Sequence, residues 1–408
     1  MGLGNHRLFF IAITLFYIVN CFAPLRLEYD SVHYFSLKEC LDNACPAGFH
    51  AANDPHPYGY PLLLWILSRL GMLHAFVIAG INALFLAGSL FFVNRSLPLS
   101  LRSFILFPLV LLQWTFIKFF AYPLSEMQYL FFSTGCLYCF QRYTLKNSPG
   151  WLIMSLLGAG MAFFTRSAGI VLAPALLAGF AWHHRGLLKA KALRNILLTL
   201  GVAGCLLAAA VILFPKFLRL ALYLNSIQYR GPGTIFLLTE HTKEWGQLLL
   251  NIPGSKILAS LPGWGNILLV LAGLLLVGVF GYAFFLQRKI LPLSVSVYLS
   301  AYCLLIFNWP FFDARFWIPI LPFIAVLIIS ISRQARRLSI WIFSAWLIMG
   351  LGAAGYSTYT AFHKAALART QAGGIFRNEY ETYFFGRPLS DTATRTDPYV
   401  LSILKRYN

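Results

Sequence analysis

The chain has 408 residues, of which 59% are hydrophobic and only 11% are charged. A soluble domain carries about 25% charged residues, so the composition excludes an ordinary soluble domain and indicates a polytopic membrane protein. The formal net charge of +19 comes without a basic cluster or a nucleic-acid-binding pattern. We therefore expect an all-α membrane protein that has no nucleic-acid partner.

The first apolar run, residues 8–25, follows Arg7 and is not followed by a small-residue cleavage site, so we interpret it as a retained helix. Several of the apolar runs are shorter than the ~20 residues that a straight span requires. The pair 151–165 and 168–183 forms either two spans or a re-entrant hairpin covered by protein, and both alternatives return the chain to the same side. The expected membrane helices number eleven, at residues 8–25, 75–93, 103–121, 126–142, 151–165, 168–183, 195–214, 264–286, 290–308, 316–332 and 338–358.

Lys and Arg residues in short connections indicate which face of a membrane protein is cytoplasmic. They gather here in one alternating set of connections, at Arg7; Arg95 and Arg102; Arg142 and Lys146; Arg185, Lys189, Lys191 and Arg194; Arg288 and Lys289; Arg333, Arg336 and Arg337. This distribution predicts a cytoplasmic N-terminus and a C-terminal tail on the outer side. All 13 Asp and Glu residues lie on the outer side or at its rim, which points to a function on that face.

The predicted transmembrane unit covers residues 1–358, and four pieces of chain face outward from it. Residues 26–74 form a first outer loop, which ends in a short interfacial helix from Tyr60 to Leu70. A turn at Glu126 follows, then a long loop at 215–262 that contains Arg230, and a small soluble tail at 359–408. Cys40 and Cys45 share the first loop and can form a disulfide if that loop is extracytoplasmic, whereas the other cysteines lie in apolar runs and suit packing.

The stretch from Glu28 to Tyr34 directly follows the first apolar run and carries two carboxylates and a histidine. Such residues at a membrane boundary are costly unless they have a function. We interpret Asp30 as a catalytic base at the outer rim of a membrane enzyme. A solvated loop with ordinary polar residues is the simpler alternative.

Glu126 and Arg166 interrupt apolar runs on the same side. Ser125 can cap the helix that begins at Glu126, and the helix dipole favours an anion there, so Glu126 is either a structural carboxylate or one that binds the acceptor. An unpaired arginine near membrane depth costs ~2.5–3.5 kcal/mol. Arg166 therefore needs Asp30, Glu126 or a lipid phosphate as a partner, or its side chain extends to the interface.

Asp313 and Arg315 lie in the connection that precedes the run 316–332. The two side chains can simply pair with each other. Two or three arginines that face one pocket would instead form a site for phosphate, which a guanidinium group binds through two parallel hydrogen bonds.

The segment from Asp54 to Pro61 contains three prolines, which fix the backbone around His56. His56 with Asp54 or Asp30 offers ligands to a divalent metal ion, but two or three scattered ligands are weak evidence. The sequence therefore requires no cofactor and leaves a divalent metal open.

At these residues the chain resembles the GT-C superfamily of membrane glycosyltransferases, which use polyprenyl-phosphate sugars as donors. The likeness is to the dolichyl-phosphate-mannose-protein mannosyltransferase-like and aminoarabinose transferase-like branches. It covers about residues 8–335, and its short, degenerate motifs are Asp30-Ser-Val-His-Tyr34, His56-Pro-Tyr-Gly-Tyr-Pro61, Thr165-Arg-Ser-Ala-Gly169 and Arg315-Phe-Trp-Ile-Pro-Ile-Leu-Pro322.

The resemblance implies that Asp30 is the catalytic or metal-site acid of the first outer loop. Many relatives have two acids in tandem there, whereas Ser31 follows Asp30 in this chain, and the usual His-Pro-Pro is His-Pro-Tyr. With the residues above, it assigns substrate binding to Glu28, Tyr34, His56, Tyr58, Glu126, Arg166, Arg230, Asp313 and Arg315.

The implied reaction is inverting transfer of a sugar from a polyprenyl phosphate to a glycan, lipid or protein acceptor of the cell envelope, at the extracytoplasmic face of a bacterial inner membrane. Because the phosphate leaves readily, one base suffices for the acceptor hydroxyl, and cations must hold the departing group. A transporter or flippase of a lipid-linked substrate is the main alternative, and a non-catalytic assembly partner is another. A transporter is expected to show internal repeats, which the sequence lacks.

Overall fold

The computed structural model describes residues 3–46, 54–185, 233–252, 263–289, 291–332, 336–389 and 396–408. Every regular element in these ranges is a helix, and none of them contains a strand. The longer elements are α1 (Leu3–Cys21), α2 (Tyr29–Leu41), α3 (Gly59–Arg69), α4 (Ala75–Ser96), α7 (Glu126–Lys146), α8 (Pro149–Thr165), α9 (Leu172–His183), α13 (Thr234–Leu250), α15 (Trp264–Gln287), α16 (Leu293–Phe307), α17 (Leu321–Ser332), α18 (Arg336–Phe362), α20 (Arg377–Phe385) and α21 (Pro398–Tyr407). The short ones are η2 (Leu99–Leu101), α5 (Leu106–Leu111), α6 (Trp114–Phe119), η3 (Ser167–Val171), η5 (Ala314–Trp317), α19 (Lys364–Thr370) and η6 (Gln371–Gly374).

Three of the described helices are long and apolar enough to cross a membrane: α4, α15 and the part of α18 from Ile340 to Phe362. Five shorter apolar segments accompany them, at Phe10–Cys21, Pro149–Thr165, Ser167–His183, Leu293–Phe307 and Leu321–Ser332. The expected all-helical architecture with membrane-length helices is thus confirmed. The predicted helix at 195–214 lies outside the described residues.

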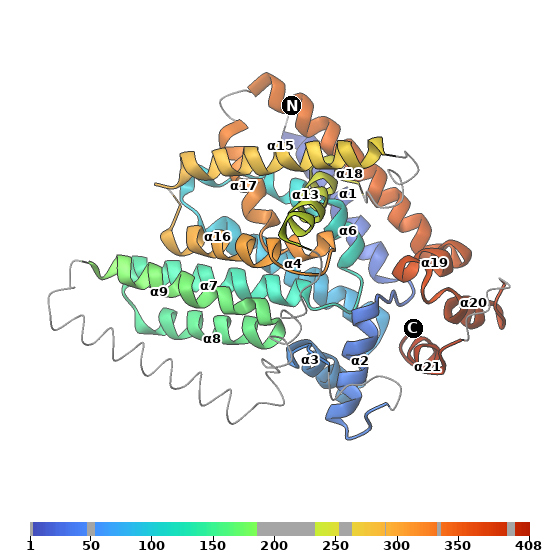
Figure 1. Cartoon of the computed structure of the whole chain (residues 1–408). Helices are drawn as coiled ribbons and strands as arrows, with labels where there is room; N and C mark the ends of the chain where they lie inside the picture. The colour runs from blue at the N-terminus through green and yellow to red at the C-terminus, as the bar shows by residue number, and fades with distance from the viewer. Residues whose placement is uncertain are drawn as a thin grey trace.

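The bundle is built from helix pairs that pack closely along the chain. α7 packs against α4 and α8, α9 packs against α16, and α13 packs against α15. Figure 1 shows α7, α8, α9 and α16 side by side on the left of the molecule. Glycine allows α13 and α15 to approach closely, because a side chain at Gly273 would collide with the backbone oxygen of Thr242.

The prediction of one continuous helix over 103–121 is wrong, since this stretch forms α5 and α6 with a break at Leu112 and Gln113. The Gln113 side chain accepts a hydrogen bond from the backbone N–H of Thr115 and caps α6. Asn251 satisfies the two backbone groups that flank the break: its amide donates to the Leu112 oxygen at 2.9 Å, and its oxygen accepts from the Trp114 N–H at 2.8 Å. A distant side chain therefore replaces the hydrogen bonds that a continuous helix would make.

The first outer loop, residues 26–74, contains more helix than expected. α3 confirms a helix close to the predicted Tyr60–Leu70, but residues 29–41, expected as loop, form α2. Glu28 precedes α2 as its N-cap and forms a capping box with Ser31. The predicted disulfide between Cys40 and Cys45 is present at the other end of this helix.

The long outer loop predicted at 215–262 also differs from expectation, because α13 occupies its middle and packs against the membrane-length helix α15. Arg230 and the rest of 215–232, together with 253–262, lie outside the described residues. The predicted helices on either side of Arg166 are confirmed as α8 and as η3 followed by α9.

The C-terminal tail forms a small helical cap over the start of α2. α18 ends at Phe362, a few residues inside the predicted tail of 359–408, and α19, η6, α20 and α21 follow. Figure 1 shows α2, α3, α20 and α21 gathered at the lower right of the molecule. The Tyr380 hydroxyl donates to the Leu25 oxygen at 2.7 Å and accepts from the Leu27 N–H at 2.9 Å, and the Tyr407 ring stacks on Phe35. The tail thus fixes the chain just before Asp30.

Candidate functional site

Four charged side chains from four elements meet below the cap. Asp30 comes from α2, Glu126 from the first turn of α7, Arg166 from the end of α8, and Arg315 from η5. Arg315 Nη2 lies 2.6 Å from Asp30 Oδ2, and Arg166 Nη1 lies 2.5 Å from Glu126 Oε1. Arg315 Nε approaches the same Glu126 oxygen at 3.7 Å. The structure therefore brings together the two arginines and the two acids that the sequence singled out.

Asp313 holds the short helix that presents Arg315. Its carboxylate accepts a hydrogen bond from the Arg315 backbone N–H at 2.9 Å and lies 3.0 Å from the Arg315 Nε atom. The local Asp313–Arg315 pair that the sequence suggested is thus present. It exists alongside the longer-range pair with Asp30, so the two interpretations of Arg315 do not exclude each other.

The charges of this cluster are strongly coupled. Burial raises the pKa of the Asp30 carboxyl, but the charge of Arg315, with smaller contributions from His56 and Arg166, outweighs it and holds the pKa well below its usual range. Asp30 is therefore ionised at neutral pH. Its side chain is 19% exposed, whereas that of Glu126 is only 1% exposed, so Asp30 is the more accessible of the two acids.

Three polar atoms in the cluster are buried and have no hydrogen-bond partner among the described residues: Arg315 Nε, Arg315 Nη1 and Glu126 Oε2. Arg315 Nε lies 3.0 Å from the Asp313 carboxylate, which leaves Arg315 Nη1 and Glu126 Oε2. A buried polar group without a partner costs about 1–3 kcal/mol, and more when it is charged. One donor and one acceptor are thus left at the centre of the cluster, which is the arrangement expected of a site that completes its hydrogen bonds with a ligand.

A further cation, Lys118 of α6, lies at the edge of the cluster. Lys118 Nζ is 3.0 Å from Glu28 Oε1, and the lysine side chain is 41% exposed, far more than that of Arg166 or Arg315. Lys118 is not among the predicted site residues, because it falls inside the continuous membrane helix expected over 103–121. A lysine within an apolar run was itself the available signal.

Tyr34 and Tyr58 occupy different surroundings. The Tyr34 hydroxyl lies 2.7 Å from the Ser125 hydroxyl, which also accepts a hydrogen bond from Arg166 Nη1 at 3.3 Å. Tyr34 thus contacts the charged cluster through Ser125. Tyr58 instead packs in a separate hydrophobic cluster with Leu37.

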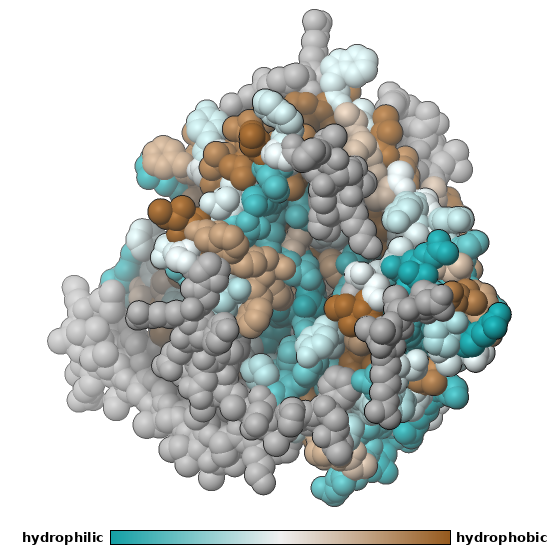
Figure 2. Space-filling view, turned by 45° about the vertical axis from the view of Figure 1, so that its right-hand side comes forward, coloured by the Kyte–Doolittle hydropathy of each residue, from teal (hydrophilic) through white to brown (hydrophobic). Residues whose placement is uncertain are grey.

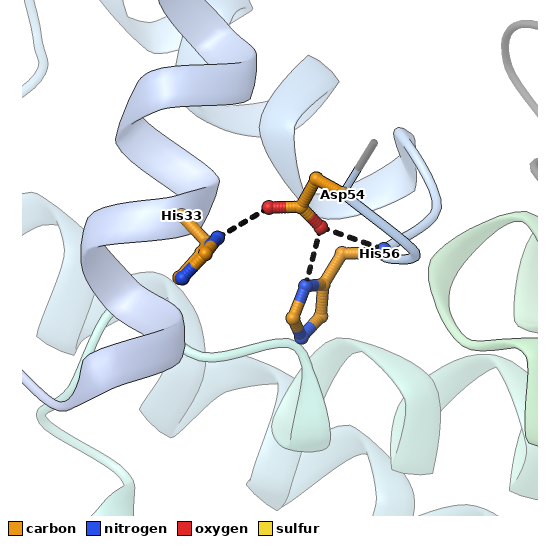
Figure 3. Close-up of side chains that lie close together, drawn as sticks. All are labelled: His33, Asp54 and His56. Atoms are coloured by element: carbon orange, nitrogen blue, oxygen red, sulfur yellow. Dashed lines mark hydrogen bonds and ion pairs between the residues drawn. The ribbon is translucent and has the colours of Figure 1, made fainter. Parts of the chain in front are cut away.

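Two histidines converge on Asp54, as Figure 3 shows. Nδ1 of His33 contacts Asp54 Oδ2, and Nδ1 of His56 lies 2.6 Å from Asp54 Oδ1. The other ring nitrogen of His56 is 3.7 Å from Asp30 Oδ2. The predicted association of His56 with Asp54 and Asp30 is confirmed as a contact, but His33 was missed. It lies one helical turn after Asp30, a spacing that becomes informative once 29–41 is known to be a helix.

The contacts within this group favour the ionised carboxylate of Asp54 and the protonated ring of His56. Burial raises the pKa of Asp54, but hydrogen bonds from His33 and His56 outweigh it and hold the pKa well below its usual range. Burial lowers the pKa of His56, yet its contacts with Asp30 and Asp54 prevail and raise it to about 10. His56 therefore adds a positive charge next to Asp30 when no metal is bound.

An apolar cavity of about 110 Å³ lies within the bundle between α5, α6, α13, α15, α17 and α18. Its lining includes Phe116 and Leu321, which are close in sequence to Lys118 and Arg315. Figure 2 brings the right-hand side of Figure 1 forward and shows hydrophilic residues in a recess with hydrophobic residues at its margins. The molecule thus combines a polar recess on this face with an apolar pocket between the helices named above.

The chain was compared with protein-family models, curated proteins and solved structures. No protein-family model, curated protein or solved structure matches the chain.

Proposed function

We propose that the chain is a GT-C-like membrane glycosyltransferase with about eleven membrane helices and an active site on the extracytoplasmic side of a bacterial inner membrane. It moves a sugar from a polyprenyl phosphate to a glycan, lipid or protein acceptor of the cell envelope. The observation that supports this most strongly is the coupled cluster of Asp30, Arg315, Arg166 and Glu126, with its buried unpartnered donor and acceptor. An apolar pocket with room for a short part of a lipid chain lies in the same bundle.

In the proposed reaction the acceptor hydroxyl attacks the anomeric carbon from the side opposite the phosphate. A bond forms between the acceptor oxygen and that carbon, the bond from the carbon to the phosphate oxygen breaks, and its electron pair leaves with the phosphate. Asp30 takes the hydroxyl proton, and Arg315 and Arg166 stabilise the departing phosphate. The anomeric centre is inverted.

The Asp30–Arg315 pair suggests how proton transfer and phosphate release are coupled. In the ligand-free site Arg315 weakens Asp30 as a base, because it stabilises the carboxylate. A donor phosphate that shares Arg315 reduces this stabilisation and raises the basicity of Asp30. When Asp30 then accepts the proton, it loses its charge. Arg315 no longer pairs with a carboxylate and interacts with the departing phosphate alone.

The test is release of polyprenyl phosphate from a panel of polyprenyl-phosphate sugars by the purified protein, compared with its Asp30→Asn variant. Loss of a general base typically costs about 10²–10⁴-fold in rate, so we expect turnover of the variant to fall by that range. Donor affinity is expected to stay equal or to increase, because Asn no longer competes with phosphate for Arg315.

Asp42→Asn is the matched control, since Asp42 lies at the far end of α2 and pairs with Lys38 and Arg69. Its turnover is expected to match that of the wild type. Near-normal turnover of Asp30→Asn would eliminate Asp30 as the base. Movement of the lipid-linked sugar across liposomes without release of polyprenyl phosphate would favour a flippase instead.

A further inference from the structure

We propose that His33, Asp54 and His56 form a binding site for one divalent transition-metal ion, zinc in the first instance, beside Asp30. The site stands on its own ligand geometry. Only the role that we give the ion toward the donor phosphate rests on the proposed glycosyltransferase function.

The ligand atoms come from two separate segments that the fold brings together. His33 projects from α2, whereas Asp54 and His56 belong to the segment that leads into α3. One ligand atom from each residue lies within 4.8 Å of the others. Figure 3 shows both imidazole rings directed at the Asp54 carboxylate. A zinc ion with bonds of about 2.0–2.2 Å would replace the direct contacts between the two ring nitrogens and the Asp54 carboxylate, so both rings must move away from Asp54 when the ion binds.

The donor set selects the class of metal. Two imidazole nitrogens and one carboxylate oxygen suit zinc and similar first-row ions, whereas magnesium and calcium prefer oxygen ligands alone. Three protein ligands leave the fourth position of a tetrahedral zinc ion open to water or substrate. The composition is therefore that of an open site, unlike the closed four-ligand site of a structural zinc.

The ligands are held in place before any ion arrives. The Asp54 side chain is 1% exposed, and Asp54 Oδ1 also accepts a hydrogen bond from the His56 backbone N–H at 2.8 Å. Pro55 and Pro57 flank His56 and restrict its backbone. The Tyr34 ring packs at right angles to the His56 ring, with centroids 5.1 Å apart. Such rigidity lowers the cost of binding an ion.

Asp30 occupies the place of a supporting carboxylate. A metal-bound histidine usually donates its other ring N–H to a carboxylate, which fixes the ring. Nδ1 of His56 faces Asp54, and its Nε2 lies 3.7 Å from Asp30 Oδ2. An ion bound at Nδ1 would thus be linked through one imidazole to Asp30. Its open position would present a positive charge to the phosphate of the donor.

The test uses the full-length protein, purified with a tag that contains no histidine, stripped with a chelator and reloaded with zinc. Elemental analysis is expected to give one zinc per chain. Replacement of zinc by cobalt is expected to give the visible absorption of a cobalt ion in a four-coordinate site. Zinc affinity is expected to fall at least tenfold in each of His33→Gln, Asp54→Asn and His56→Gln.

His183→Gln is the matched control, because His183 lies at the end of α9 and outside the cluster. It is expected to keep the full zinc content. Thermal unfolding separates a lost ligand from a lost fold: zinc should raise the melting temperature of the wild type and the control but not of His33→Gln, provided that the apo proteins melt alike.

The proposal is overturned if the wild type binds less than one zinc per chain, or if all three ligand variants keep wild-type affinity. Neither readout uses a sugar donor. Stoichiometric zinc in a protein that transfers no sugar would therefore leave the site intact and refute only the proposed function. Sugar transfer by a protein that binds no zinc would refute the zinc site and leave the proposed function intact.

Discussion

Arg166 and Arg315 are both bound to carboxylates in the ligand-free site, and neither is a free cation that waits for a phosphate. A phosphate that enters must therefore exchange places with a carboxylate or add to an existing pair. Such an exchange costs less than the desolvation of a new ion, because the arginines are already out of water. It also makes phosphate binding sensitive to the acids as well as to the arginines.

Arg315→Ala and Arg166→Ala are each expected to weaken binding of polyprenyl phosphate about tenfold or more, the loss expected when one charge-assisted hydrogen bond disappears. The Lys variants are expected to restore binding only in part, since Lys lacks the planar fork of donors. Titration of the detergent-solubilised protein with labelled polyprenyl phosphate measures the effect. Arg69→Ala, at the exposed end of α3, is the control, and unchanged affinity in both cluster Ala variants would remove the arginines from the phosphate site.

The sequence was sufficient to find the charged core of the site but not its full composition. Asp30, Glu126, Arg166 and Arg315 stand out because ionised residues beside apolar runs are rare. Their mutual distances depend on how α2, α7, α8 and η5 pack, which no local pattern contains. The pairing of His33 with Asp54 was not predicted, because the two residues meet only when α2 lies against the segment before α3.

At the scale of elements, length and apolar character predicted the long helices well. α4 and α15 agree with the expected 75–93 and 264–286 within a few residues. The failures have tertiary causes: Asn251 takes over the hydrogen bonds at the α5–α6 break, and α13 lies in a stretch that reads as loop because it mixes polar and apolar residues. Such elements are stabilised by partners that are distant in sequence.

The junction between α2 and α3 depends on Asp42, which accepts a hydrogen bond from Trp65 and pairs with Lys38 and Arg69. Burial raises the pKa of Asp42, but these partners together outweigh it and lower the pKa overall. A lowered folded-state pKa stabilises the fold above the unfolded value of about 3.9, and the contribution disappears as the pH falls through the folded value.

Asp42→Asn is therefore expected to lower the melting temperature at pH 7, by a free-energy loss of about 1 kcal/mol or less for exposed ion pairs. The difference from the wild type should narrow as the pH falls below 4. Thermal melts of both proteins between pH 3 and pH 8 test this. A constant difference over the whole range would mean that the charge of Asp42 contributes nothing.

The cap contacts the site through Tyr380, whose hydroxyl forms hydrogen bonds with the backbone on both sides of Arg26. In Tyr380→Phe two buried backbone groups lose their partner, at a cost of about 1–3 kcal/mol. We expect a lower melting temperature and slower turnover with little change in donor binding, because Tyr380 touches the backbone before Asp30 and not the arginines. Tyr383→Phe is the control, as its hydroxyl forms no hydrogen bond within the described part of the chain, and equal behaviour of the two variants would disprove the positioning role.

For the molecule as a whole, contact between the cap and α2 places the first outer loop and the C-terminal tail on the same side. Lys38 Nζ lies 3.4 Å from the Tyr407 hydroxyl, and the Leu25 N–H donates to the Asn408 side chain at 2.8 Å. The compartment that this side faces stays a prediction from the Lys and Arg distribution. The Cys40–Cys45 disulfide agrees with an oxidising, extracytoplasmic location.

Single cysteines introduced at Tyr29 and Ser402, both exposed, are expected to react with a membrane-impermeant maleimide added to intact cells. A cysteine at Lys146, at the opposite end of α7 from Glu126, is expected to react only after the membrane is opened. Labelling of Lys146→Cys in intact cells, without labelling of the other two, would invert the topology and with it the proposed active-site location.

The Asp30–Arg315 pair also has a consequence for biosynthesis, because its members are 285 residues apart in the chain. Synthesis and membrane insertion proceed from the N-terminus, so Asp30 reaches its side of the membrane long before the ribosome has made Arg315. Glu126 finds Arg166 after only 40 further residues, whereas a nascent chain that ends before α16 still presents Asp30 without its arginine. Insertion of α16 and η5 is therefore the step that brings Arg315 to this carboxylate, and until then His56 is the charged partner encoded nearest to it in the chain.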